Sequence, residues 1–232
     1  MRPPSARLRP SLRLRLEIAP SRFVVLCAGA TAGPIAPRDG IDTVILACAM
    51  LRQRHGVDAM LIVIGAERGS DSNGGNGGDS GGDSGARPAH CRGEDPELAR
   101  LHHLARELDV ARHVRFAPHP PQAALADYHA AADVFASTPW HASPAAASAV
   151  ARAMACALPV VCTAVGTAVG AASGAIAAMV RDGVTGYLLP PRDPETLCRC
   201  LARLQRQPLL ARSMGMAGQA HASATPHRKT FA

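Results

Sequence analysis

Aromatic residues and lysine are scarce in this chain. Phe, Trp and Tyr together make up 3% of the 232 residues, and Lys229 is the only lysine. Single-stranded nucleic acids are usually held by aromatic side chains interleaved with basic ones. Although the net charge is +7, the composition therefore argues against a nucleic-acid partner.

Long apolar runs are also missing. No stretch approaches the roughly 20 apolar residues that a membrane-spanning helix needs, and no compact apolar segment follows the arginines near the amino terminus, as it would in a signal peptide. We therefore expect no transmembrane segment and a cytoplasmic location. The hydrophobic content of 47% is still high enough for a real core.

The seven cysteines suggest neither a disulfide framework nor a metal site. Six lie in apolar windows, and only Cys91 lies in a polar stretch. Buried, reduced thiols are expected from this placement. His102 and His103 share one predicted helix, but no third ligand is placed near them, so surface histidines are expected rather than a zinc site. We assign no metal and no cofactor.

Most of the chain alternates short β-rich runs with windows of helical spacing. The β-rich runs are residues 23–28, 60–64, 114–116, 133–136, 159–162 and 184–189. Repeated βα steps with right-handed crossovers predict a parallel sheet that is covered by helices on both faces. We therefore predict an α/β fold, a single Rossmann-like domain of about six strands over residues 23–218.

Three segments are predicted to lie outside this core. Residues 1–22 carry six arginines and are expected to form a solvated basic tail, although leucines alternate with polar residues there as in a half-buried strand. Residues 69–85 are almost wholly Gly, Ser, Asn and Asp, a composition that predicts a disordered insertion. Residues 219–232 are expected to be a polar tail.

The stretch from residue 131 to residue 166 is the most informative one. It reads as a strand, a loop rich in Ser, Thr and Pro, an Ala-rich helix and a second strand. In such a βαβ unit the carboxyl ends of the strands and the amino termini of the helices face one crevice, where backbone N–H groups favour a phosphate. The loop 137–144 and the turn after Cys162 should flank that crevice.

The same stretch carries a family resemblance. The segments AADVF, STPW, RAMACALPVV and AVG resemble the signature of the glycosyltransferase group 1 family. Members of that family use nucleotide-sugar donors and have two facing Rossmann-like domains, an arrangement called GT-B. The resemblance is to the second, donor-binding domain. It implies a nucleotide-diphosphate sugar as substrate and a helix end before the first strand. The acceptor-binding part would belong either to a longer enzyme of which this chain is a fragment or to a separate chain.

The family's two glutamates, which contact the donor sugar and the ribose, are both replaced. The second falls at Arg152, and the first falls at Pro144 or, with the other possible spacing, at Ala142. None of these side chains offers the acceptor oxygens that such contacts need. His141 could accept one hydrogen bond when neutral, and a solvated loop histidine is the alternative. Ala157 stands where the family has a glycine. If this residue adopts the left-handed conformation of a helix cap, alanine costs about 1 kcal/mol there.

The family's two cations after the first strand are replaced as well, by Pro34 and Asp39. An aspartate there would repel a diphosphate by about 1 kcal/mol or more. Arg38 is the one neighbouring candidate to compensate, and a solvated loop arginine is the alternative. Backbone donors survive, so the predicted donor-binding residues, with no catalytic residue assigned, are Gly33, Arg38, His141, Gly166 and Thr167.

Three functions follow from these patterns. The first is the donor-binding half of a hexosyl-type glycosyltransferase that is inactive alone, and the second is a non-catalytic module that binds a nucleotide sugar or another protein. The third, a dinucleotide oxidoreductase, is weak, because the spacing of Gly29 and Gly33 is not G-x-G-x-x-G and no acidic ribose ligand follows suitably.

Overall fold

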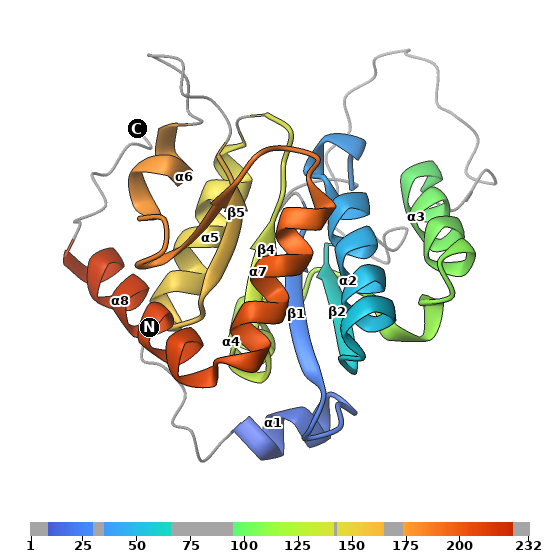
Figure 1. Cartoon of the computed structure of the whole chain (residues 1–232), viewed down its shortest axis with the longest axis horizontal. Coiled ribbons are helices and arrows are strands. Elements are labelled where there is room, and N and C mark those ends of the chain that lie inside the picture. Colours follow the sequence, from blue (N-terminus) through green and yellow to red (C-terminus); the bar gives the residue numbers. More distant parts are fainter. Residues whose placement is uncertain (1–8, 30–34, 66–94, 142, 165–173, 225–232) are drawn as a thin grey trace, which may run out of the picture.

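In the computed structural model, one parallel sheet organises the described part of the chain, which comprises residues 9–29, 35–65, 95–141, 143–164 and 174–224. The strand order is β3-β2-β1-β4-β5-β6 (Figure 1). The strands are β1 (Phe23–Ala28), β2 (Ala59–Ile64), β3 (Val114–Ala117), β4 (Val134–Ser137), β5 (Val160–Thr163) and β6 (Gly186–Leu189). This arrangement confirms the predicted α/β class and the six-stranded parallel sheet.

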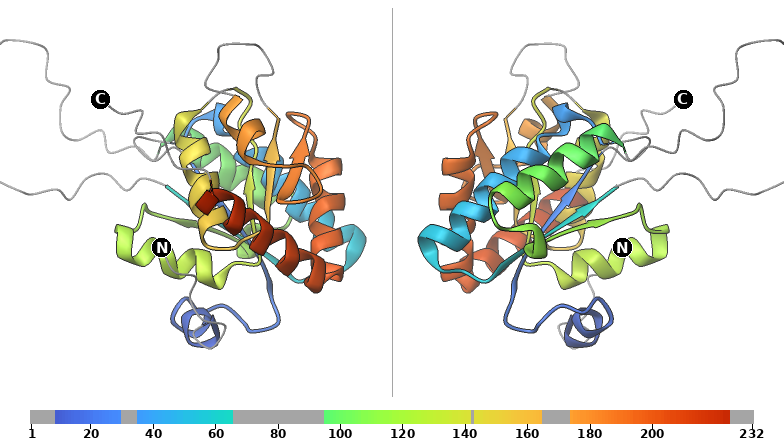
Figure 2. Two further views of the ribbon diagram at one scale, coloured as in Figure 1. Left: turned by 90° about the vertical axis from the view of Figure 1, so that its left-hand side faces the viewer. Right: turned by 90° about the vertical axis from the view of Figure 1, so that its right-hand side faces the viewer.

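Helices cover both faces of the sheet, and Figure 2 shows the sheet between the two layers. The helices are α1 (Arg9–Arg15), α2 (Ile41–His55), α3 (Pro96–Glu107), α4 (Gln122–Ala131), α5 (Pro144–Ala155), α6 (Gly174–Met179), α7 (Pro194–Arg206) and α8 (Pro208–Ala224), with 3-10 turns η1 (Pro37–Asp39) and η2 (Ala111–His113). Strand β1 shows why two layers are needed. Val25 and Cys27 pack among residues of α2, α3 and α7, while Val24 and Leu26 pack on the opposite face among residues of α4 and α5.

The prediction of a solvated tail before β1 is wrong for residues 9–22. These residues form α1 and a turn, in which Leu12, Arg13 and Ile18 are buried. The guanidinium of Arg13 donates to the carbonyl oxygens of Ala131, Pro20 and Arg22, so this arginine is bonded to protein rather than to water. The suggested strand is wrong too, and the helix that the family resemblance implied is present.

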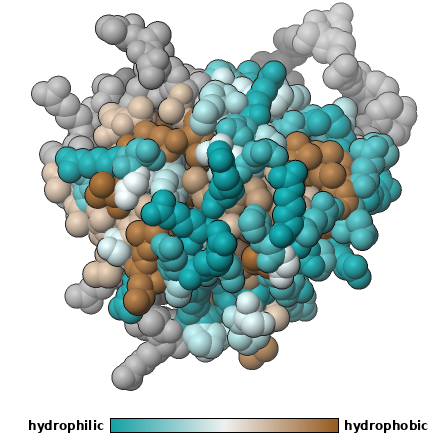
Figure 3. All heavy atoms as spheres, viewed as in Figure 1, coloured by the Kyte–Doolittle hydropathy of each residue, from teal (hydrophilic) through white to brown (hydrophobic). Residues whose placement is uncertain are grey.

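The predicted polar tail also begins later than residue 219. Helix α8 continues to Ala224, and the side-chain amide of Gln219 donates to the carbonyl oxygen of Ala155 over 2.8 Å. Glycine permits this close packing, because a Cβ on Gly215 would lie 2.0 Å from the carbonyl oxygen of Ala157. Hydrophobic residues reach the surface on the side where α8 lies (Figure 3). Two residues of α8, Leu209 and Met216, are 83% and 57% exposed.

Ala157 occupies the left-handed position that the sequence suggested. Its φ is 58°, and it follows the last turn of α5. The N–H of Leu158 bonds the carbonyl oxygen of Ala153 over 3.1 Å, and the N–H of Ala157 bonds that of Met154 over 2.9 Å. This pair of hydrogen bonds defines the Schellman motif, in which the left-handed residue is usually glycine.

We expect Ala157→Gly to raise the free energy of unfolding by about 0.5 to 1 kcal/mol. The substitution removes the clash of Cβ with the backbone, and the greater entropy of glycine in the unfolded chain offsets part of the gain. Urea denaturation measures the change. The matched control is Ala151→Gly within α5, which should lower the free energy by about 1 kcal/mol. A similar loss from both substitutions would contradict the prediction.

Candidate functional site

A crevice opens where strands β1 and β4 lie side by side. The chain leaves β1 through α2 toward β2, and it leaves β4 through α5 toward β5, so the connections diverge at the carboxyl ends of these two strands. Ligands of open α/β sheets bind at such a switch point. A small hollow is found there, lined by Ala28, Gly29, Asp39, Ser137, Pro139, Ser143 and Ala146.

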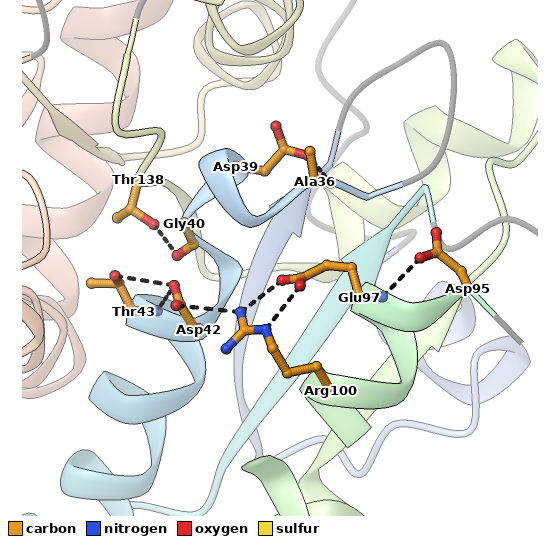
Figure 4. Close-up of polar contacts among 9 residues, drawn as sticks. All are labelled: Ala36, Asp39, Gly40, Asp42, Thr43, Asp95, Glu97, Arg100 and Thr138. Carbon is orange, nitrogen blue, oxygen red and sulfur yellow. Dashed lines mark hydrogen bonds and ion pairs between the residues drawn. The ribbon is translucent and has the colours of Figure 1, made fainter. Parts of the chain in front are cut away.

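The loops after β1 and β4 are locked together at the wall of this hollow. Gly40 has a φ of 71°, and the hydroxyl of Thr138 donates to its carbonyl oxygen over 2.7 Å (Figure 4). A Cβ on Gly40 would lie 1.8 Å from the carbonyl oxygen of Thr138. Both the backbone conformation and the close approach therefore require glycine at this position.

Asp39, at the family's lysine position, has a local role in the structure. Its carboxylate accepts a hydrogen bond from the N–H of Ala36 over 2.9 Å and so caps the turn η1 (Figure 4). The side chain nevertheless lines the hollow. Because the carboxylate is already bonded to a backbone donor, part of its charge is compensated before any ligand arrives.

Arg38 precedes Asp39 at the same edge of the sheet. Its side chain is exposed and has no carboxylate partner in the described part of the chain. Its carbonyl oxygen accepts a hydrogen bond from the N–H of Trp140 over 2.9 Å. Since Trp140 belongs to the loop after β4, this bond holds the backbone of Arg38 beside that loop, although Arg38 is not among the residues that line the hollow. His141, the next residue, is exposed in the same loop.

Trp140 also contacts Arg192, a residue that the sequence did not single out. The guanidinium carbon of Arg192 lies 3.7 Å from the centroid of the indole ring. Arg192 follows β6, and its φ of 57° is unusual for a residue with a side chain. The rule that sites lie at the carboxyl ends of parallel strands would have drawn attention to it.

The two family glutamate positions lie apart in the structure. Pro144 is the first residue of α5, directly after Ser143, whose hydroxyl oxygen accepts from the N–H of Ala146 over 3.2 Å. Arg152 lies further along α5 and lines a different small cavity with His119 and His129. The crevice therefore keeps a helix amino terminus but gains no side-chain acceptor at either position.

His129 is buried beside Arg152. Its Nδ1 lies 2.8 Å from the carbonyl oxygen of Leu125, while its Nε2 has no hydrogen-bond partner in the described part of the chain. Burial lowers the pKa of His129 below its usual value, and the positive charge of Arg152 lowers it further, whereas the hydrogen bond from Nδ1 to the carbonyl oxygen of Leu125 raises it. The imidazole is thus neutral near pH 7.

The start of α2 is acidic on the side that faces α3. Arg100 donates to both oxygens of Glu97 over 2.8 and 2.6 Å and to Asp42 over 3.4 Å (Figure 4). These contacts, first of all the hydrogen bonds to Glu97, raise the pKa of Arg100. Asp95 caps α3 by accepting from the N–H of Glu97. Arg100 is therefore already neutralised and is not available to an anion.

Two of the five predicted donor-binding residues, Arg38 and His141, lie in adjoining loops after β1 and β4, and neither lines the small hollow. Gly33, Gly166 and Thr167 fall outside the described residues, as does the predicted insertion 69–85. Within the described ranges there is no group of three or more His, Cys, Asp or Glu that could hold a metal ion. No helix there is long and apolar enough to cross a membrane.

The family model described as Glycosyl transferases group 1 matches residues 22–221. No curated protein is similar enough to the chain to count as a match. Several solved structures are similar. Sucrose-phosphate synthase from Thermosynechococcus elongatus is 25% identical with a TM-score of 0.67, over 93% of this chain and 44% of that one.

Two further solved structures share the fold at lower identity. HepE from Anabaena, solved in complex with UDP-glucose, is 21% identical with a TM-score of 0.69, over 95% of this chain and 49% of that one. The second is the C-terminal domain of a glycosyl transferase group 1 family protein, LpcC from Francisella tularensis. It is 16% identical with a TM-score of 0.66, over 95% of this chain and 93% of that domain. The chain thus spans about half of the longer proteins and nearly all of the isolated domain.

Proposed function

Because this chain belongs to the glycosyl transferases group 1 family, we propose that it is the donor-binding half of a glycosyltransferase. It binds the diphosphate of a nucleotide sugar in the crevice between β1 and β4. The observation that carries the proposal is the position of Arg38, which has no ion pair with any described residue and whose backbone is bonded to Trp140 at the switch point of the sheet. HepE is a protein of similar fold, and its complex with UDP-glucose supports the choice of ligand class.

The crevice offers three kinds of favourable contact to a diphosphate. The amino terminus of α5 presents backbone N–H groups beyond the one that Ser143 satisfies. The guanidinium of Arg38 supplies a delocalised charge that matches phosphate oxygens. The carboxylate of Asp39 opposes both, although its bond to Ala36 reduces the repulsion. The balance predicts weak binding, with a Kd on the order of 0.1 to 1 mM.

Sugar transfer requires a second half. The bond between the anomeric carbon and the diphosphate oxygen breaks, while an acceptor hydroxyl bonds to that carbon and loses its proton to a base. The correspondence with an isolated C-terminal domain supports a chain that holds only the donor. The acceptor site and the base would then be supplied by a separate chain or by sequence beyond this one.

A non-catalytic nucleotide-sugar-binding module is the second candidate. The observation in its favour is that Pro144 and Arg152 offer no carboxylate where the family uses two. Calorimetric titration with UDP, UDP-glucose, GDP and NADH tests both candidates. We expect binding of a nucleoside diphosphate and none of NADH. If no nucleoside diphosphate binds, both candidates are wrong, and preferential binding of NADH would point to an oxidoreductase.

We expect Arg38→Ala to weaken the binding of UDP or GDP by about 1 to 3 kcal/mol, the range for charged hydrogen bonds. The same titration measures it. Arg54→Ala is the matched control, because Arg54 is an exposed arginine on α2 whose partner is Glu195, away from the crevice. Unchanged affinity in Arg38→Ala would show that the backbone alone holds the phosphates.

A further inference from the structure

Arg192 has no assigned role in binding the diphosphate, yet it lies at the same edge of the sheet. It follows β6, while the diphosphate crevice lies between β1 and β4, with β5 between. Trp140 bridges this interval, because its N–H bonds the carbonyl oxygen of Arg38 and its ring lies under the guanidinium of Arg192. Trp140 is therefore joined to Arg38 through the backbone and to Arg192 through its ring.

The contact with Trp140 leaves the guanidinium of Arg192 available to a ligand. A guanidinium over an aromatic face gains cation–π attraction through its flat face, and the five N–H donors point outward in its own plane. Arg192 has no ion pair or hydrogen bond to a carboxylate among the described residues. Asp193, the next residue, directs its carboxylate to the N–H of Thr196 over 2.9 Å and so caps α7. Such a fixed fork matches a carboxylate better than a hydroxyl.

The charges around the crevice differ between its two sides. Toward β2 lie Asp42 and Glu97, and Arg100 is fully engaged by them. Toward β6 lies Arg192, next to Asp193, whose carboxylate bonds the N–H of Thr196, and the loop 137–144 contains no acidic residue. An anionic group on the ligand is therefore repelled on the first side and attracted on the second.

We propose that Arg192, oriented by Trp140, binds a carboxylate on the sugar of the donor, so that the preferred donor is a nucleotide-diphosphate uronate. This rests on the proposed donor binding in the crevice. The diphosphate lies at Arg38, the sugar extends along the edge toward β6, and its carboxylate accepts two N–H bonds from Arg192. A neutral hexose offers no partner of matching charge.

Titration of UDP, UDP-glucose and UDP-glucuronate against the whole chain tests the proposal. We expect UDP-glucuronate to bind about 10- to 100-fold more tightly than UDP-glucose, the range for hydrogen bonds between charged groups. Arg192→Asn should bring the two affinities within about 2-fold of each other and leave the affinity for UDP unchanged. Asparagine tolerates the left-handed backbone of residue 192, so this variant keeps the turn.

Arg112→Gln is the matched control, because Arg112 is an exposed arginine in η2, before β3 and far from the carboxyl edge of the sheet. It should leave the preference intact. Equal affinity of the unaltered chain for both donors would overturn the uronate proposal alone, provided that UDP binds. An equal loss for UDP and UDP-glucuronate in Arg192→Asn would also overturn it, since Arg192 would then hold the diphosphate. Failure of UDP itself to bind would overturn the proposed function as well.

Discussion

Arg13→Ala is expected to lower the free energy of unfolding by about 3 to 5 kcal/mol, the cost of breaking a buried ion pair. The side chain of Arg13 is 7% exposed and donates to Asp133 over 2.7 Å. It also donates to three carbonyl oxygens, those of Ala131, Pro20 and Arg22. Alanine leaves the three carbonyl oxygens without this donor and leaves Asp133 with Arg9 and the N–H of Val24 as its remaining partners.

The carboxylate of Asp133 joins α1 to the sheet. Asp133 accepts hydrogen bonds from Arg9, from Arg13 and from the N–H of Val24, the last over 2.7 Å. The loss of Arg13 therefore loosens α1 from both β1 and β4. Urea denaturation of the whole chain gives the free energy, and the slope of the transition shows whether α1 has detached.

Arg15→Ala is the matched control for this experiment. Arg15 lies in the same helix and also pairs with an aspartate, Asp127, but its side chain is 70% exposed. Surface pairs contribute about 0 to 1 kcal/mol. If Arg13→Ala costs no more than Arg15→Ala, the buried network does not anchor the amino-terminal helix.

The sequence predicted the fold well because the strands are short apolar runs with clear limits. Strand β1 has the predicted bounds, 23–28, and the other strands lie within two residues of theirs. The failures are at the two ends of the chain. Composition cannot show that the guanidinium of Arg13 finds carbonyl oxygens rather than water, nor that Gly215 and Gly218 let α8 pack closely on α5. Both depend on which segments meet in three dimensions.

The site could be predicted only in part for a similar reason. Arg38 and His141 are found by counting along the chain from the family's motifs, because each lies in a loop that directly follows a strand. The pairing of Trp140 with Arg192 is a side-chain contact between the loop after β4 and the turn after β6, and the sequence does not show that these two side chains meet. The sequence also does not show that Arg152 lines a cavity with His119 and His129, apart from the crevice.

The chain alone is expected to transfer no sugar. Departure of the diphosphate needs preorganised donors, and removing one such contact commonly costs ~10²- to 10³-fold in rate. This chain has Pro34 and Asp39 in place of two cations and Pro144 and Arg152 in place of two carboxylates. The four losses do not simply multiply, because residues that act as a unit are not additive, but all act in the same direction.

A restored variant tests whether these positions would account for the expected lack of activity. It combines Pro34→Arg, Asp39→Lys, Pro144→Glu and Arg152→Glu, and a second version carries Ala142→Glu instead of Pro144→Glu. The measurements are affinity for UDP-glucose and hydrolysis of this donor, with the unaltered chain beside them. We expect at least 10-fold tighter binding and detectable hydrolysis only in a restored chain.

The structure says which of these substitutions should be tolerated. Glutamate at position 144 suits the first turn of α5, where a negative charge is favoured by the helix dipole. Asp39→Lys removes the acceptor for the N–H of Ala36 and should cost about 1 kcal/mol, so stability must be measured alongside binding. If the unaltered chain hydrolyses the donor or transfers sugar as fast as a restored chain, the expected inactivity is wrong. Catalysis would then use residues other than the four replaced positions.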